Sequence, residues 1–226
     1  DHFQPQLLVG LTATPERMDG KDLRPDFGNR ISAEIRLPQA LQAGLLTPFQ
    51  YLCISDDTDL SDDSLWSGQK YNIERLADKL CAKTRAQLIV DALHKYLADE
   101  YTCRALCFCV NKRHADFMAE QLRLYGFNAQ SLTSDTPADE RKQLAKDLRE
   151  GTLHYLCVVD IFNEGVDIPE VDTVLFLRPT ESLTIFLQQL GRGLRLSAGK
   201  TELTVLDFVA QANRKYDFAS RFRALT

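Results

Sequence analysis

Three polar residues near the C-terminal end of the chain, Gln188, Arg192 and Arg195, have types and spacing that suit the binding of phosphate. At positions i, i+4 and i+7 of a predicted helix they share one face, opposite an apolar stripe of Leu183, Phe186, Leu187, Leu190 and Leu194. Two planar guanidinium groups can each donate paired hydrogen bonds to phosphate oxygens. The alternative is an ordinary solvated face. No acidic residue lies between Glu181 and Glu202 to pair with the arginines, which favours an external anion.

The glycines around Arg192 support this interpretation. Gly191 and Gly193 would each weaken a helix by about 1 kcal/mol relative to alanine, so they predict the close approach of another surface. The Gly-Lys-Thr sequence at 199–201 resembles the end of a phosphate-binding loop. It follows a helix and precedes a strand, however, which is the reverse of the order that such a loop needs, so we predict a simple turn.

A candidate carboxylate precedes this helix in the segment "VVDIFNEGVDIP". A predicted strand ends at Asp160, a turn passes through Gly165, and Asp167 stands shortly before Pro169. A carboxylate just beyond a strand can accept hydrogen bonds from ribose hydroxyls or hold an arginine, and an ordinary turn acid is the alternative.

Alternating strands and helices must position these residues. The pattern predicts strands at 7–11, 49–55, 104–110, 128–133, 153–160, 172–177 and 203–209. It predicts helices at 37–44, twice within 73–101, and at 115–126, 136–151 (capped by Thr136), 182–195 and 211–226. An acidic loop at about 56–70 is the predicted flexible linker. Such alternation indicates a doubly wound parallel α/β sheet, which binds ligands beyond the carboxyl ends of its strands.

Composition narrows the functional classes. The 226 residues are 44% hydrophobic, which suffices for one large domain or two small ones. A net charge of −5 argues against a broad basic surface for DNA, although a narrow track of phosphate contacts remains compatible. The chain has no apolar run that could span a membrane and no signal sequence. The six cysteines form no Cys-x-x-Cys pair, which argues against zinc and favours core cysteines in a cytoplasmic protein.

Four segments, in order, resemble the motifs of superfamily 2 helicases and translocases, the RecA-fold motor proteins related to the DEAD/DEAH-box group. They are "GLTATPER" (motif III), "RALCFCV" (motif IV), "VVDIFNEGVDIP" (motif V) and "QQLGRGLR" (motif VI, Gln-x-x-Gly-Arg-x-x-Arg). The resemblance covers nearly the whole chain. Within the superfamily the chain resembles bacterial proteins with a type III restriction-like helicase core. It departs from the pattern at Val159, where many relatives carry threonine, and at Ser134, where glycine is commoner.

The resemblance implies two parts of a motor. Residues 1–47 would be the C-terminal remnant of a first RecA-like, ATP-binding domain, and residues 48–226 the second RecA-like domain. The phosphate loop and the magnesium-binding motif of such motors are not in this sequence, and we expect them in the first domain, upstream. ATP and Mg²⁺ would therefore bind only in the full-length protein, and this chain alone should not hydrolyse ATP.

The resemblance also implies roles for individual residues. Arg192 and Arg195 would be arginine fingers, and Gln188 would reach the γ-phosphate or the attacking water. Nucleotide contacts would come from Gly165, Asp167 and Gly191. Coupling between the ATP cleft and the nucleic-acid track would involve Thr12, Ala13 and Thr14. The phosphates of the bound strand would meet Asn111, Lys112, Thr133 and Ser134.

The predicted function is therefore the C-terminal portion of an ATP-dependent helicase or translocase that acts on DNA, with RNA as an open alternative. A RecA-like scaffold or binding module that has lost catalysis is a second hypothesis. A helicase subunit of a restriction or nuclease system is a third.

Overall fold

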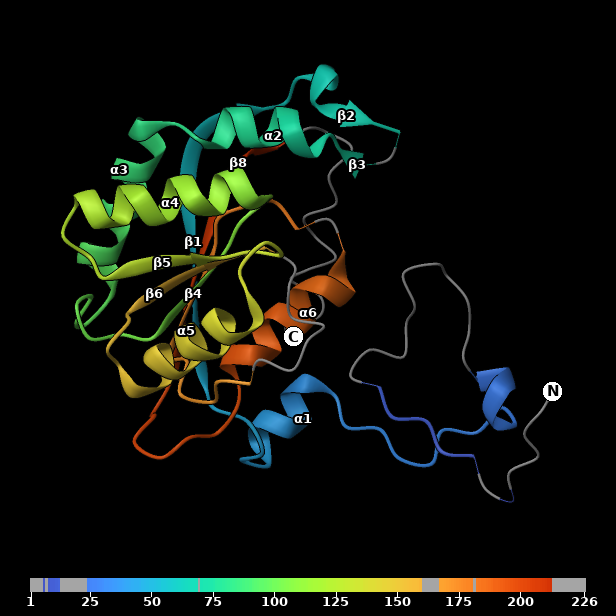
Figure 1. Cartoon of the computed structure of the whole chain (residues 1–226). Helices are drawn as coiled ribbons and strands as arrows, with labels where there is room; N and C mark the ends of the chain where they lie inside the picture. Colours follow the sequence, from blue (N-terminus) through green and yellow to red (C-terminus); the bar gives the residue numbers. More distant parts are fainter. Residues whose placement is uncertain are drawn as a thin grey trace.

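A six-stranded sheet forms the centre of the computed structural model, which describes residues 6, 8–12, 24–68, 70–159, 167–180 and 182–212 (Figure 1). All of its strand pairs are parallel, in the order β1-β8-β7-β4-β6-β5. The strands are β1 (Phe49–Leu60), β4 (Ala105–Phe108), β5 (Ala129–Leu132), β6 (Tyr155–Val158), β7 (Thr173–Phe176) and β8 (Leu203–Ala212). The predicted parallel α/β sheet is confirmed.

Helices cover both faces of the sheet (Figure 1). One face carries α3 (Lys83–Tyr96) and α4 (Lys112–Leu124), with α2 (Ile73–Leu80) beside them, and the other carries α5 (Ala138–Glu150) and α6 (Leu183–Gly193). Successive strand residues point to opposite faces. In β4, Ala105 and Cys107 therefore join the core under α3 and α4, whereas Leu106 and Phe108 join the core under α5 and α6.

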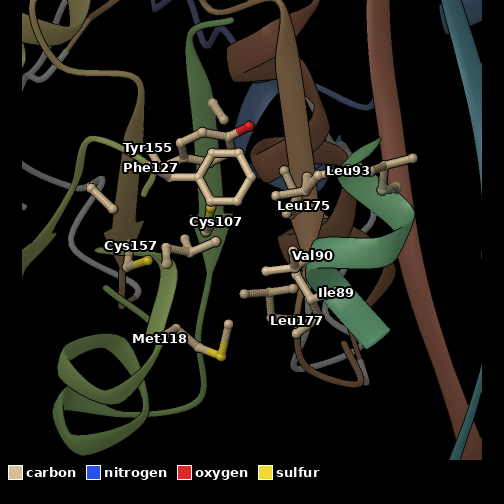
Figure 2. Packing of buried hydrophobic residues seen from close by; sticks show 14 of the residues in the cluster. Ile89, Val90, Leu93, Cys107, Met118, Phe127, Tyr155, Cys157, Leu175 and Leu177 are labelled. Carbon is tan, nitrogen blue, oxygen red and sulfur yellow. The ribbon is translucent and has the colours of Figure 1, made fainter. Parts of the chain in front are cut away.

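Large apolar side chains fill the core between the sheet and the first helical layer. Figure 2 shows Ile89 and Leu93 of α3 in the same buried cluster as Leu175 of β7 and the nearby Leu177. The rings of Phe127 and Tyr155 meet edge to face, with centroids 5.2 Å apart. The predicted core cysteines are confirmed at four positions, since Cys103, Cys107, Cys109 and Cys157 are buried.

The acidic segment at 56–70 corrects the prediction of a flexible loop. Residues 56–60 complete β1, because Asp56 is neutralised inside the protein by Arg85, whose Nε lies 2.7 Å from the carboxylate. The rest forms the 3₁₀ turn η2 (Asp63–Leu65) and a short hairpin of β2 (Trp66–Ser67) and β3 (Lys70–Tyr71). The rings of Trp66 and Tyr71 lie at a tilt of 38° with centroids 4.4 Å apart, so the segment has its own packing.

The strand predicted at 7–11 is wrong for its described residues. Residues 8–11 form no strand, and Leu11 is 96% exposed. A strand needs a neighbour to take up its backbone hydrogen bonds, and none of the described strands pairs with this segment. The next elements are η1 (Arg24–Phe27) and α1 (Leu37–Gln42), and the latter confirms the helix predicted at 37–44.

Three helix boundaries also differ from the prediction. The helix predicted at 182–195 ends at Gly193, so Arg195 lies beyond it. Pro137, not Thr136, is the N-cap of α5, because the Thr136 hydroxyl instead accepts a hydrogen bond from the Thr133 amide at 3.0 Å. The C-terminal helix predicted at 211–226 is wrong at 211–212, which belong to β8, and its remainder lies outside the described residues.

Candidate functional site

Helix α6 is fixed against the sheet by its apolar face. Ser182 caps its N-terminus by accepting a hydrogen bond from the Ile185 amide at 3.3 Å. Phe186 is fully buried, and its ring lies 5.1 Å from the ring of Phe176. A Cβ at Gly193 would lie 2.6 Å from the Leu203 side chain, so the predicted close approach of another surface is confirmed at this glycine.

The opposite face of α6 presents the candidate phosphate-binding residues. Gln188 is exposed and Arg192 is partly exposed. Among the described residues, no atom would lie within 4 Å of a Cβ at Gly191, so packing against them does not require a glycine there. The polar stripe predicted from the sequence is therefore present from Gln188 to Arg192, and Arg195 follows it just after the end of the helix.

Asp167 holds Arg195. Its carboxylate forms an ion pair with Arg195 Nη1, and both side chains are partly exposed, at 54% and 40%. The ion pair agrees with one of the two roles left open for this carboxylate, and the contact with a nucleotide stays a prediction. Ion pairs this exposed contribute about 0–1 kcal/mol, so the contact orients the guanidinium more than it stabilises the fold. On the other side, Arg149 of α5 donates to the Asp167 carbonyl at 2.8 Å.

Lys200 ties the end of α6 to the segment that carries Asp167. Gly199 has a φ of +80°, which confirms the predicted turn, and Lys200 Nζ donates to the carbonyls of Gly193 (2.5 Å), Arg195 (3.0 Å) and Pro169 (3.2 Å). Burial lowers the pKa of Lys200 to about 8, although Asp172 and Glu170 attract its charge. Lys200, the lysine of the sequence that resembles a phosphate loop, therefore binds backbone carbonyls of the protein itself.

The four predicted strand-contacting residues follow two strands at the carboxyl edge of the sheet, three of them on loops and Lys112 at the first position of α4. Asn111 and Lys112 follow β4, and Thr133 and Ser134 follow β5. Lys112 Nζ lies 2.6 Å from the Asp135 carboxylate, so the two loops are side by side. Asn111 also caps α4, since its Oδ1 accepts a hydrogen bond from an amide of the first turn at 3.0 Å.

Sequence reasoning missed the residue that braces the second loop. Arg141 donates to the carbonyls of Ser134 at 2.8 Å and Thr136 at 2.7 Å. It lies in the first turn of α5, from which a long side chain reaches back over the preceding loop. The position of Arg141, four residues after Pro137, was the feature of the sequence that could have predicted this contact. Thr133 itself is buried and Ser134 is exposed, so only Ser134 presents its side chain openly.

A buried polar group lies behind the first loop. His114 is fully buried, and its Nδ1 accepts a hydrogen bond from the Val110 amide at 3.2 Å. Burial, followed by the charges of Arg85, Arg178 and Arg113, lowers the pKa of His114 to about 3. The histidine is therefore neutral at pH 7 and has a structural role.

Some predicted residues lie outside the described part of the chain, namely Ala13, Thr14 and Gly165. Thr12 is described and exposed. Among the described residues, no group of three or more histidine, cysteine, aspartate or glutamate side chains could hold a metal ion. Within the same residues, no helix has both the length and the apolar character needed to cross a bilayer.

Comparison with known protein families assigns most of the chain to one family. The profile of the helicase conserved C-terminal domain matches residues 64–197. The chain belongs to this helicase family. The matched part of this helicase C-terminal domain contains both loops at the carboxyl edge and the Asp167–Arg195 pair, whereas β1 and β8 lie outside it.

Relatives of this helicase domain include proteins from fungi, phages and bacteria. A Saccharomyces cerevisiae protein described as a candidate ATP-dependent helicase, IRC3, is 27% identical over 220 residues, which cover 94% of this chain and 32% of the relative. A 51.5 kDa Lactococcus phage protein is 28% identical over 197 residues, which cover 87% of this chain and 42% of the relative. The endonuclease subunit of the Escherichia coli type I restriction enzyme EcoKI is 27% identical and is covered over 14% of its length. The chain thus spans less than half of each of these relatives.

Solved structures share the fold. A fragment of a candidate HsdR subunit of a type I restriction enzyme from Vibrio vulnificus superimposes with a TM-score of 0.67 at 24% identity, covering 93% of this chain and 40% of that one. The C-terminal domain of the DEAD-box protein Dbp5 gives a TM-score of 0.51 at 17% identity, covering 79% of this chain and 84% of that one. These likenesses establish the RecA-like fold of the second helicase domain. The restriction enzymes found in these comparisons are of type I, whereas the motifs resemble a type III group.

Proposed function

We propose that this helicase C-terminal domain forms one wall of the ATP site of an ATP-dependent helicase or translocase. The observation that carries the proposal is the arrangement at the end of α6, where Asp167 orients Arg195 beside the polar face that bears Arg192. The descriptions of the fungal relatives as candidate ATP-dependent helicases support it.

The proposed chemistry is electrostatic. During phosphoryl transfer, negative charge develops on the phosphate oxygens, and guanidinium groups fixed next to them stabilise that charge. Arginine fingers are worth roughly 10³–10⁵ in rate where they have been measured. Arg192 and Arg195 would supply this stabilisation, and the exposed Gln188 would hold the γ-phosphate or the attacking water. The open space beside Gly191 leaves room for the nucleotide to approach the helix.

We propose ATP with Mg²⁺ as the cofactor of the whole protein. The arginine-bearing face of α6 fits the phosphates of ATP, which are anionic and bind several hydrogen-bond donors. The described residues offer no cluster of metal ligands. The contribution of this part of the chain is therefore to bind and orient phosphate, and no step is assigned here to the metal.

A single strand of DNA is the proposed substrate of the track. The loops after β4 and β5 together present Asn111, Lys112 and Ser134 at the carboxyl edge of the sheet, beside the buried Thr133. Contacts of these residue types go to phosphates and fix position without reading the bases. The similarity to the subunit of a type I restriction enzyme favours DNA and also favours a helicase subunit of a restriction system.

The test is ATP hydrolysis by the complete gene product, measured with no nucleic acid, with single-stranded DNA and with single-stranded RNA. The proposal expects hydrolysis that DNA stimulates severalfold, and RNA stimulating more strongly than DNA would reassign the substrate. Strand binding without hydrolysis would instead support a scaffold that has lost catalysis. This chain alone is expected to give no hydrolysis above background.

A further inference from the structure

The backbone carbonyls at and just beyond the C-terminal end of α6 accept hydrogen bonds from residues outside the helix. Carbonyls at a helix C-terminus lack partners within the helix and need donors from elsewhere. The Thr47 amide donates to the Leu194 carbonyl at 2.8 Å, and the Thr47 hydroxyl donates to the Arg195 carbonyl at 2.9 Å. Lys200 Nζ donates to the same Arg195 carbonyl at 3.0 Å. The backbone of Arg195 is therefore held from two sides.

Both donors lie just before two paired strands of the sheet. Thr47 is 1% exposed and lies two residues before β1, and Lys200 lies three residues before β8. The two strands are paired in register from their first residues, and the Leu203 amide donates to the Pro48 carbonyl at 2.9 Å just ahead of that pairing. Motion of Thr47 or Lys200 relative to the sheet is thereby restricted.

The chemistry of the two side chains fits this task. The Lys200 ammonium group has three N–H donors, and three carbonyls accept from it. A positive charge at a helix C-terminus also interacts favourably with the helix dipole. Thr47 uses both its amide and its hydroxyl, so replacing the hydroxyl by a methyl group removes one contact to Arg195 without changing the side-chain shape.

We propose that Thr47 and Lys200 form a clamp that positions Arg195 for phosphoryl transfer. Both are positioning residues, because they act through the backbone of Arg195 and through the segment that carries its ion-pair partner Asp167. Thr47 also stands at the predicted boundary between residues 1–47 and 48–226. The inference rests on the proposed function, since it assigns Arg195 to the reaction.

The first arm of the test is independent of catalysis. Amide hydrogen exchange at residues 194–197 is measured in the complete gene product and in its Thr47→Val and Lys200→Met variants. The clamp predicts exchange at least about tenfold faster in both variants, confined to this segment. Thr84→Val and Lys142→Met, two exposed sites in α3 and α5, serve as matched controls and should leave the exchange unchanged. Unchanged exchange in Thr47→Val and Lys200→Met would refute the clamp.

The second arm is a double-mutant cycle on ATP hydrolysis. Thr47→Val and Lys200→Met should each lower kcat about ten- to a hundredfold with little change in KM, because a misplaced catalytic group weakens the transition state. Thr47→Ser, which keeps the hydroxyl, should retain kcat. In an Arg195→Ala background the same substitutions should cause no further loss, because their effect passes through Arg195.

The two arms separate the possible failures. Losses that multiply in the Arg195→Ala background would show a general structural role and overturn the positioning proposal. A wild-type protein that does not hydrolyse ATP would overturn the proposed function together with the catalytic part of this inference. The exchange measurement would still decide whether the clamp exists.

Discussion

At the scale of the residue, the partner of Arg195 comes from a distant part of the sequence. No acid stands near Arg195 in the sequence between Glu181 and Glu202, yet Asp167 reaches its guanidinium from the segment before β7. The ion pair leaves both side chains partly exposed, so the guanidinium keeps room to contact a ligand. Orientation of a cation by a carboxylate is useful at a phosphate site because the geometry is set before the charge develops.

Asp167→Asn tests this orientation. The substitution removes the charge that holds Arg195, so kcat for ATP should fall about tenfold, whereas the free energy of unfolding should change by less than about 1 kcal/mol because the pair is exposed. Steady-state kinetics and urea unfolding measure the two quantities. Asp139→Asn, at a fully exposed position of α5, is the control. An unchanged kcat would show that Asp167 does not orient a reacting group.

Lys112→Ala tests the proposed track. Each lysine that neutralises a phosphate of a single strand contributes about 0.7 to the slope of log affinity against log salt concentration. The variant should therefore bind single-stranded DNA more weakly and with a slope reduced by about this amount, as measured by fluorescence anisotropy. Lys95→Ala, at the C-terminal end of α3, should change neither quantity. Equal slopes for wild type and Lys112→Ala would remove Lys112 from the interface.

At the scale of the element, Gly191 and Gly193 play different parts in α6. Alanine at 193 would place its Cβ 2.6 Å from Leu203 and 3.1 Å from Val174, both fully buried, and should destabilise the protein by about 1–3 kcal/mol. Alanine at 191 meets open space and should be neutral or stabilising by up to about 1 kcal/mol. Urea unfolding of the two variants provides the comparison. A Gly193→Ala variant as stable as Gly191→Ala would contradict the packing described for this helix.

The elements differ in how far the sequence could predict them. Helices α4 and α5 combine an apolar period with a glycine stop, and both were placed to within a few residues. Residues 56–60 were missed as part of a strand because the partner of Asp56 lies 29 positions away, at Arg85. The apolar run at 8–11 reads as a strand, but a strand also depends on a neighbour that the run itself does not encode.

The sequence alone indicated the residues of the candidate site, but it did not indicate the residues that hold them in place. The types and spacing of Gln188, Arg192 and Arg195 predict a phosphate-binding face, and the structure exposes Gln188 and partly exposes Arg192 on α6. The clamp of Thr47 and Lys200 has no local signal, because hydrogen bonds to backbone carbonyls depend on the fold and not on the residue types that supply the carbonyls. Lys200 also belongs to the Gly-Lys-Thr sequence at 199–201, which resembles a phosphate-binding loop and so suggests a different role.

At the scale of the whole molecule, His114 makes stability depend on pH. Its pKa in the folded protein is about 3, against a usual value of 6.5, so the unfolded chain binds a proton first as the pH falls. The stabilisation is complete above pH 6.5 and is lost as the pH falls towards 3. Burial raises the pKa of Asp56, but Arg85 and Thr58 outweigh it and lower that pKa, which adds further acid sensitivity below about pH 4.

His114→Asn should therefore flatten the pH dependence between 6.5 and 4.5. In this window the wild-type free energy of unfolding should fall more steeply than that of the variant, by up to about 1.4 kcal/mol per pH unit. Urea unfolding at several pH values measures the two slopes. Thr84→Val, at an exposed site that does not titrate, should keep the wild-type slope. Parallel slopes for wild type and His114→Asn would show that His114 is not the buried neutral group described here.

The central claim is that Arg195 acts on the phosphate during ATP hydrolysis, and its most direct test is the turnover of Arg195→Ala in the complete gene product. With single-stranded DNA and saturating ATP, the account predicts a kcat lower by about 10³-fold or more, while strand binding and the unfolding free energy stay close to wild type. Lys142→Ala, an exposed cation on α5, should keep the wild-type kcat. An Arg195→Ala protein that turns over ATP at the wild-type rate would contradict the account.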